Sequence, residues 1–373
     1  MVDFTITDFD TGATKTNTET NKDNPLLSAN QLGVEPVFCD RVSDGSRKAG
    51  WTEDVDSVIG GTITDQADYI EIYQRINAYA HVERDVATDN ITIQGKLKLA
   101  TTSVTASWTP CVYLYWDTDN WVGCGVNGTP LGHRSHKNIL STEVGSVVAT
   151  GSVLIGTWYW YKVVLTPTTF TTYYSLDGIS FIQITTGARP GSWSGAPALI
   201  IAGKGYSDNP TYPNPDMDNS IGTVATSNSH MTDMVVMPYQ AAGTWESAVQ
   251  TMSASSKMLN TTITHQDLSA SDKITEIRWQ VGGVTKATYS TDIVSGASTT
   301  IVEADLTSGT FDDVNADFTI EVDLATGGAD TTPLITEIDG DYEDSGIVKF
   351  RFDGEVFADP AGVGFRFDGE VNP

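Results

Sequence analysis

The segment from Gly156 to Ile184, GTWYWYKVVLTPTTFTTYYSLDGISFIQI, constrains the fold more than any other stretch of the chain. Aromatic and β-branched residues dominate it, and turn residues interrupt it at 167–169 and 177–178, so it predicts three consecutive strands. Apolar residues occupy both faces of the first strand: Trp158, Trp160 and Val164 on one, and Tyr159, Tyr161, Val163 and Leu165 on the other. A strand with one wet face should alternate apolar and polar residues, so we expect this one to be buried on both sides.

The run WYWYKVVLTPTTFTTYYSLDGISF resembles the central meander of laminin-G and concanavalin-A-like jelly rolls, in which a Trp-Tyr strand precedes a Tyr-rich strand and an Asp-Gly turn. The resemblance extends more weakly over residues 35–239. It implies a two-sheet sandwich, and the roughly ten to twelve strands expected in this region, about 8 to 15 residues apart, fit such a fold. We therefore predict an all-β protein whose main domain is a jelly roll.

The chain is expected to contain four segments. Residues 1–34 hold one short strand and then a polar run, which predicts an extended arm or linker. The jelly roll follows at 35–240. Residues 241–344 carry about six or seven further strands and predict a smaller β-sandwich. A short tail, 345–373, ends the chain.

The second sandwich resembles the accessory β-sandwiches of phage tail proteins and extracellular carbohydrate-active proteins. Those domains open with a Gly-Trp-x-Ser-x-Val pattern and close with a Thr-Pro-Leu strand and a Tyr. Here the opening reads GTWESAVQ, and Thr332-Pro333-Leu334 and Tyr342 match the ending.

The tail contains an internal repeat. The sequence FRFDGEV begins at Phe350 and again at Phe365, 15 residues later. Each copy places two Phe side chains on one face, and a unit this small cannot bury them by itself. They must pack against the preceding domain, sister chains or another protein. We favour packing between molecules, which makes Phe350, Phe352, Phe365 and Phe367 the predicted assembly residues.

The charge of the chain is strongly one-sided, with 48 acidic and 21 basic residues and a formal net charge of −27. Phosphate binding needs clustered Lys and Arg, and none appear, so nucleic acid is not an expected partner. No run approaches the ~18 to 20 consecutive apolar residues that span a bilayer, so we expect no membrane insertion. The start, MVDFTITDFDTG, does not read as a secretory signal. The chain thus resembles an extracellular β protein but starts without an export signal. A virion protein, which is made in the host cytoplasm and acts outside the cell, would combine these two features. Removal of a signal would also explain the missing export signal.

Three cysteines are too few for a disulfide framework. Cys111 and Cys124 flank a predicted hairpin, which leaves a cross-strand disulfide open, although two buried free thiols are the favoured interpretation.

No catalytic motif emerges from the chain. Laminarinase-type hydrolases, which share the jelly-roll resemblance, carry two carboxylates as Glu-x-Asp-x-x-Glu on one strand, and nothing in 35–239 fits that pattern. The nearest run, Glu337 to Glu343, is one residue too long and predicts an acidic solvent face on an edge strand. His133 and His136 form the one close histidine pair, in a predicted loop, but a zinc site needs further ligands.

Calcium is the cation that the resemblance implies. Many laminin-G-like jelly rolls bind one Ca²⁺ with an Asp at the start of the final strand, and Asp233 occupies a comparable place. The loop SDNPTYPNPDMDNS is rich in oxygen ligands, which hard cations prefer. We expect no required cofactor and a structural Ca²⁺ as the candidate, with Asp208, Asp216, Asp218 and Asp233 as its ligands; a solvated acidic loop is the simpler interpretation.

Sugar binding would need exposed aromatic rings beside hydrogen-bonding groups. Trp116 and Trp121 bracket a predicted turn, and three further aromatics fall in predicted loops. The candidate ligand-binding residues are therefore Trp116, Trp121, Trp193, Tyr206 and Tyr212, although most Trp residues in such folds belong to the core.

Three functions remain open. The favoured one is a non-catalytic structural or adhesion protein of a bacteriophage virion, in a tail, fibre or head appendage, that binds a host-surface glycan. The second is a secreted, extracellular carbohydrate-binding protein, and the third is a glycoside hydrolase, against which the missing carboxylate motif argues. The first function predicts assembly with sister chains, most simply as a trimer, and with other virion proteins.

Overall fold

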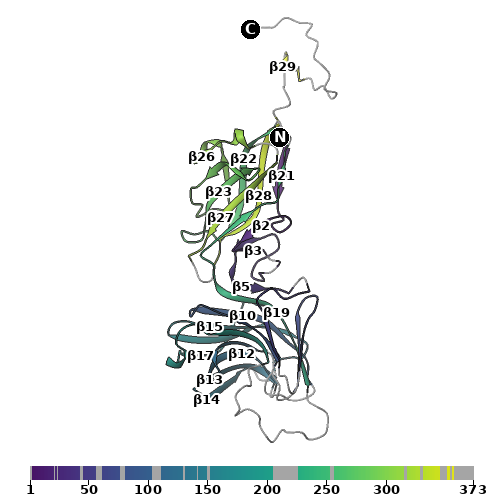
Figure 1. Cartoon of the computed structure of the whole chain (residues 1–373), viewed down its shortest axis with the longest axis vertical. Helices are drawn as coiled ribbons and strands as arrows, with labels where there is room; N and C mark the ends of the chain where they lie inside the picture. The colour runs from purple at the N-terminus through teal and green to yellow at the C-terminus, as the bar shows by residue number, and fades with distance from the viewer. Residues whose placement is uncertain are drawn as a thin grey trace.

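The computed structural model describes residues 2–20, 22, 24–42, 45–55, 61–75, 80–102, 111–128, 131–140, 142–148, 152–204, 226–252, 256–314, 317–327, 331–344, 351–352 and 355–356. These residues form strands and three short 3-10 helices, η1 (Gly191–Trp193), η3 (Glu303–Asp305) and η4 (Phe311–Asp313), so the all-β prediction is confirmed. Among the same residues, no helix has the length and hydropathy needed to cross a bilayer. Figure 1 shows two sandwiches stacked along the long axis of the molecule, with the jelly roll at the lower end.

The jelly roll consists of two antiparallel sheets. We name them the back sheet, in the order β17-β16-β15-β10-β19-β8-β7 with β5 paired to β19, and the front sheet, in the order β14-β13-β12-β11-β18-β9-β6. The strands of the back sheet are β5 (Pro36–Asp40), β7 (Gly61–Asp65), β8 (Ile70–Arg75), β10 (Ile91–Thr102), β15 (Trp158–Leu165), β16 (Thr169–Ser175), β17 (Ile182–Ala188) and β19 (Thr226–Tyr239). The strands of the front sheet are β6 (Thr52–Val55), β9 (Ala80–Asp85), β11 (Cys111–Asp117), β12 (Asn120–Gly128), β13 (Leu131–Ile139), β14 (Thr142–Val148) and β18 (Leu199–Lys204).

The main core of the jelly roll lies between these sheets, because alternate residues of each strand point inward. On β15, Tyr159, Tyr161 and Val163 are buried in this core, whereas Trp158 and Trp160 are only half-buried on the outer face. The expectation that this strand is buried on both sides is therefore wrong. Its two faces do differ in exposure, but aromatic side chains take the outer positions that polar ones usually fill.

The predicted three-strand meander is present, since β15 pairs with β16 and β16 with β17. Its second turn is organised by Asp177, whose Oδ1 accepts hydrogen bonds from the backbone N–H groups of Ile179 at 2.8 Å and Ser180 at 2.7 Å. These bonds, with a further one from Ser175, lower the pKa of Asp177 to about 2. Gly178 takes a φ of 76°, the left-handed conformation that glycine adopts most easily.

The first 34 residues are not an arm or linker. Their first strand, β1 (Val2–Ile6), runs antiparallel to β28 (Leu334–Asp344), and Ile6, Phe9, Leu32 and Val34 are buried in the core of the second sandwich. Figure 1 shows the chain starting beside that sandwich and descending from it into the jelly roll. The polar run was misleading because its threonines are themselves strand residues: β2 (Thr14–Thr16) and β3 (Thr18–Thr20) both pair within the second sandwich.

The second sandwich is thus assembled from both ends of the chain, and the jelly roll is inserted into it. One sheet has the order β25-β22-β28-β4-β3, with β1 on β28, and the other has the order β2-β20-β27-β23-β24-β26, with β21 on β27. Besides β1, β2, β3 and β28, the strands of the second sandwich are β4 (Leu32–Val34), β20 (Ala242–Glu246), β21 (Gln250–Thr251), β22 (Ser256–Gln266), β23 (Lys273–Val281), β24 (Val284–Tyr289), β25 (Ser298–Val302), β26 (Ser308–Gly309) and β27 (Asp317–Ala325).

The chain enters and leaves the jelly roll at one place. Pro36 of β5 lies opposite Tyr239 of β19, and the N–H of Gln240 donates to the carbonyl oxygen of Glu35 at 2.9 Å. A salt bridge also crosses the junction, because Lys48 Nζ of the jelly roll lies 3.2 Å from Glu19 Oε2 of the second sandwich.

All three cysteines are buried free thiols, so the disulfide alternative is not realised. Val112 lies opposite Cys124 and Cys111 lies opposite Gly125, which places the two thiols on different faces of the front sheet. Of the repeated tail, the structure describes only β29 (Arg351–Phe352) and β30 (Glu355–Val356), which pair with each other. Phe352 closes β29; Phe350, Phe365 and Phe367 lie outside the described residues.

Candidate functional site

The outer face of the back sheet gathers aromatic rings and lysines. We call this surface the aromatic–lysine face; it comprises Tyr69, Lys96, Lys98, Trp158, Trp160, Lys162, Tyr173 and Phe181, all of them half-buried. The strand period of two produces it, since Trp158, Trp160 and Lys162 alternate along β15 and Lys96 and Lys98 alternate along β10.

The register of β10 and β15 brings each tryptophan beside a lysine. Trp158 lies opposite Lys98, and Trp160 lies opposite Lys96. Lys98 Nζ is 4.6 Å from the centre of the Trp158 ring, and Lys96 Nζ is 5.6 Å from that of Trp160. Tyr69 extends the row, with its ring edge-on to Trp158 at 6.2 Å.

A second cation–aromatic group continues the face toward β16. Lys162 lies opposite Tyr173, and its Nζ is 5.2 Å from the Tyr173 ring centre and 3.6 Å from that of Phe181. The two rings meet edge to face with their centres 6.5 Å apart. Such contacts each contribute about 0.5–1 kcal/mol at an exposed site, so the lysines are held over the rings but remain available to a ligand.

The face is locally cationic on a strongly acidic protein, which has a net charge of −27. Lys96 is 3.7 Å from Asp233, but no carboxylate among the described residues pairs with Lys98. Burial lowers the pKa of Lys98. Sequence reasoning missed this face because it assigned both sides of β15 to the core; the signal that could have revealed it is the period-two spacing of Lys96-x-Lys98 and Trp158-x-Trp160-x-Lys162.

Two of the aromatic residues proposed as ligand platforms belong to the packing of the jelly roll. Trp193 in η1 is fully buried, and its Nε1–H donates to the carbonyl oxygen of Asn138 at 3.1 Å. Trp116, partly buried against the core, stacks on it with ring centres 5.2 Å apart and planes 14° apart. Trp193 is therefore not a platform, and Trp116 has one ring face covered. Tyr206 and Tyr212 lie outside the described residues.

Trp121 lies on the outer face of the front sheet, in an aromatic cluster separate from the main core. It meets Tyr113 edge to face at 5.5 Å and lies nearly parallel to His136 at 6.1 Å. Gly123 permits this arrangement, since a Cβ there would lie 2.2 Å from Cδ1 of Tyr113. Trp121 is only 7% exposed, so its ring is a packing surface rather than an open platform.

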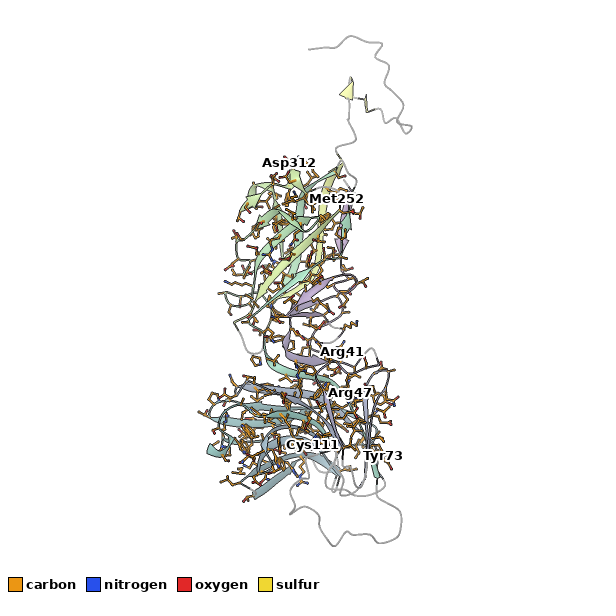
Figure 2. The ribbon with its side chains drawn as sticks, viewed as in Figure 1. Arg41, Arg47, Tyr73, Cys111, Met252 and Asp312 are labelled. Atoms are coloured by element: carbon orange, nitrogen blue, oxygen red, sulfur yellow. The ribbon has the colours of Figure 1, made fainter. Side chains whose placement is uncertain are left out.

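Asp233 does not have the surroundings of a calcium ligand. Its carboxylate lies 3.6 Å from Arg41 Nε and 3.7 Å from Lys96 Nζ, and these cations already balance its charge. Burial nevertheless raises the pKa of Asp233. Figure 2 places Arg41 where the jelly roll meets the second sandwich. The other proposed ligands, Asp208, Asp216 and Asp218, lie outside the described residues.

The histidine pair does not converge on a shared metal position. His133 and His136 lie on strand β13, not in a loop, and both are buried. His133 points into the core, where its Nδ1 lies 2.9 Å from Tyr161 Oη and burial lowers its pKa to about 4. His136 points outward to Trp121, so the sheet separates the two rings.

The acidic residues of β28 alternate along the strand as predicted, but β28 is not the edge strand that was predicted. Glu337, Asp339 and Asp341 share one half-buried face, as the spacing predicts. However, β28 pairs with β22 on one side and with β1 on the other, so it is not an edge strand. Asp341 accepts a hydrogen bond from Asn260 Nδ2 at 3.0 Å, which is a structural contact between neighbouring strands.

No family model matches the sequence, and no curated protein matches it. Among solved structures, a GH43 protein from Bacillus licheniformis is similar to this chain at 13% identity and a TM-score of 0.39, over 53% of this chain and 38% of that one. The catalytic domain of a laminarinase from Thermotoga petrophila is similar at 10% identity and a TM-score of 0.37, over 54% of this chain and 96% of that one. The activities named for those proteins are theirs and carry no argument about this chain.

Proposed function

We propose that this protein is a non-catalytic structural or adhesion protein of a bacteriophage virion, in a tail, fibre or head appendage, whose jelly roll binds a polysaccharide of the host surface. The observation that carries the binding half of the proposal is the aromatic–lysine face. Trp158 and Trp160 stand about 7 Å apart on one strand, which lets both rings contact successive parts of an extended ligand.

The chemistry of this face favours an acidic polysaccharide. Flat aromatic rings offer apolar surface to the C–H faces of pyranose rings, and lysine ammonium groups donate hydrogen bonds to hydroxyl, carboxylate or phosphate oxygens. The rest of the chain is acidic, so a polyanion would be repelled elsewhere and would concentrate at this face.

The front sheet favours binding over hydrolysis. Its central strand β11 directs Cys111, Tyr113 and Tyr115 outward, and none of these side chains is a carboxylate. Retaining glycosidases need two carboxyl groups about 5–5.5 Å apart beside the bond that they break. On this face Asp54 and Glu83 approach each other, and both converge on one imidazole, that of His81. A glycoside hydrolase is the alternative, and reducing-sugar release from a glucan would favour it.

The binding half can be tested with charged and neutral polymers. We expect the full-length chain to bind alginate, a carboxylated polysaccharide, more tightly than dextran, a neutral one, in a biolayer-interferometry titration. Trp158→Ala and Trp160→Ala should each weaken alginate binding about tenfold, which corresponds to about 1.4 kcal/mol. Thr171→Ala, on the same sheet face but outside the aromatic–lysine face, should leave it unchanged. Equal affinity for alginate and dextran, or tryptophan variants that bind like the parent, would refute this half.

The virion half is supported by the end-to-end sandwiches, the acidic composition and the FRFDGEV repeat, which suit a repeated unit on a symmetric particle. We expect light scattering to give the full-length chain the mass of a defined oligomer, a trimer in the simplest case. Removal of residues 346–373 should reduce that mass while both sandwiches still melt cooperatively. An unchanged mass would show that the tail does not assemble the particle, and the absence of virion genes beside its gene would favour a secreted carbohydrate-binding protein.

A further inference from the structure

A second group of charged side chains lies at one end of the front sheet, on its outer face. We call it the Asp/His cluster; it consists of Asp54 of β6 and His81 and Glu83 of β9. Asp54 and His81 are directly opposite each other across the two strands. Glu83 follows His81 by two residues and therefore shares its face.

The distances in the Asp/His cluster are those of ligands around one small ion. His81 Nε2 lies 3.4 Å from Glu83 Oε2 and 3.8 Å from Asp54 Oδ2, and the three ligand atoms all lie within 4.8 Å of one another. Ligand atoms held about 2.0–2.2 Å from a tetrahedral ion lie about 3.3–3.6 Å apart. The observed spacing requires only small side-chain movements to match that geometry.

The charges of the cluster also call for a cation. The Nε2 atom of an imidazole can donate one hydrogen bond, yet two carboxylates approach it and repel each other at this range. Among the described residues, no lysine or arginine forms an ion pair with Asp54 or Glu83. The His81 side chain is fully buried, whereas those of Asp54 and Glu83 are 33% and 21% exposed, so the cluster is rigid at its base and open on one side.

We propose that Asp54, His81 and Glu83 bind a divalent transition-metal ion, with zinc as its representative. One imidazole nitrogen and two carboxylate oxygens form a mixed donor set, which suits zinc and its neighbours better than calcium or magnesium. The three protein ligands leave a coordination position on the exposed side, where water or a ligand oxygen would complete the shell. This site is independent of the proposed glycan binding, because it lies on the other sheet of the jelly roll.

Zinc binding by the full-length protein tests the proposal. We expect the EDTA-treated and desalted chain to take up one Zn²⁺ in a calorimetric titration, and elemental analysis after desalting to return the same ratio. Glu83→Gln and Asp54→Asn should each weaken zinc binding at least tenfold, since each amide keeps the side-chain shape but removes the anionic ligand. Both side chains are partly exposed, so these variants should melt like the parent in EDTA, which a change at the buried His81 need not do.

The matched control is Asp85→Asn. Asp85 lies on the same strand and the same face, is exposed, and is not a member of the cluster. This variant removes the same charge and should bind zinc like the parent, which separates a defined site from diffuse attraction to an acidic surface. The proposal is overturned if the parent shows no saturable zinc binding, or if Asp85→Asn weakens it as much as Glu83→Gln. The cluster would then be a contact between side chains that binds no metal.

Discussion

Lys48 Nζ of the jelly roll lies 2.7 Å from Glu35 Oε1 and 3.2 Å from Glu19 Oε2, and the contact with Glu19 joins the inserted domain to the sandwich that carries it. Burial by itself would lower the pKa of Lys48, but Cys39, Glu35 and Glu19 around it raise that pKa. The Lys48 side chain is 28% exposed and that of Glu19 only 7%, so the pair is shielded from solvent more than a surface ion pair is.

Removing the Lys48 charge should destabilise the junction. We expect Lys48→Met to lower the free energy of unfolding by about 1–3 kcal/mol, because it leaves the buried Glu19 carboxylate without this partner. Chemical denaturation of the two proteins measures the difference. Lys257→Met breaks the exposed Lys257–Asp312 pair, with side chains 43% and 69% exposed, and should change stability by less than about 0.5 kcal/mol. Equal effects of the two substitutions would show that Lys48 is an ordinary surface charge.

Phe9→Ala tests whether the N-terminal residues are part of the second sandwich. The Phe9 ring is buried 5.2 Å from that of Trp245, and the Phe9 carbonyl oxygen accepts a hydrogen bond from Trp245 Nε1 at 3.0 Å. We expect the substitution to cost about 3–5 kcal/mol and to lower the melting temperature of the second sandwich. Leu26→Ala, at a side chain that is 39% exposed, is the control and should have little effect. A free arm would tolerate both changes alike.

The jelly roll should lose stability in mild acid through His133. Its pKa is about 4 in the fold against 6.5 when exposed, so the unfolded chain binds more protons between these pH values. The contribution is fully present above pH 6.5 and declines as the pH falls toward 4, by about 2–3 kcal/mol in total. Thermal melts across this range should show the loss, and His133→Gln should flatten it for the jelly roll. The second sandwich provides an internal comparison, because burial lowers the pKa of His265 there in the same direction.

Lys98 should oppose stability while it supports binding. Because burial lowers its pKa, protonation favours the unfolded chain, and stability should rise as the pH increases through the folded pKa of Lys98 toward 10.5. At neutral pH we therefore expect Lys98→Met to melt at the same temperature as the parent or slightly higher, and to bind alginate several-fold more weakly. A Lys98→Met variant with lower stability and unchanged binding would contradict both expectations.

The strands of the jelly roll could be read from the sequence because local signals determine them. The Asp177-Gly178 turn and the β-branched runs around it predict the β15–β17 meander, and the structure contains it. The exposure of the outer side chains of β15 could not be predicted from local signals of this kind. Its outer face is bordered by Lys96 and Lys98 of β10, about 60 residues earlier in the chain, and their Nζ atoms lie 5.6 Å and 4.6 Å from the centres of the Trp160 and Trp158 rings.

The insertion of the jelly roll into the second sandwich could not be predicted from the sequence for a similar reason. Val2 pairs with Tyr342, at the opposite end of the described sandwich sequence, and nothing local to either residue indicates its partner. The Asp/His cluster shows an intermediate case. The His81-x-Glu83 spacing places two ligands on one face, but the third, Asp54, is identified only by the register of β6 against β9.

The two chain segments that bound the jelly roll run side by side at Pro36 and Tyr239, so the inserted domain is connected to the second sandwich at a single place. A domain whose two ends lie a few ångströms apart could take its place if it also supplied a cation for Glu19 where Lys48 lies. Exchange of the inserted domain would leave the strand pairing of the second sandwich, including β28 with β1 and β22, unchanged.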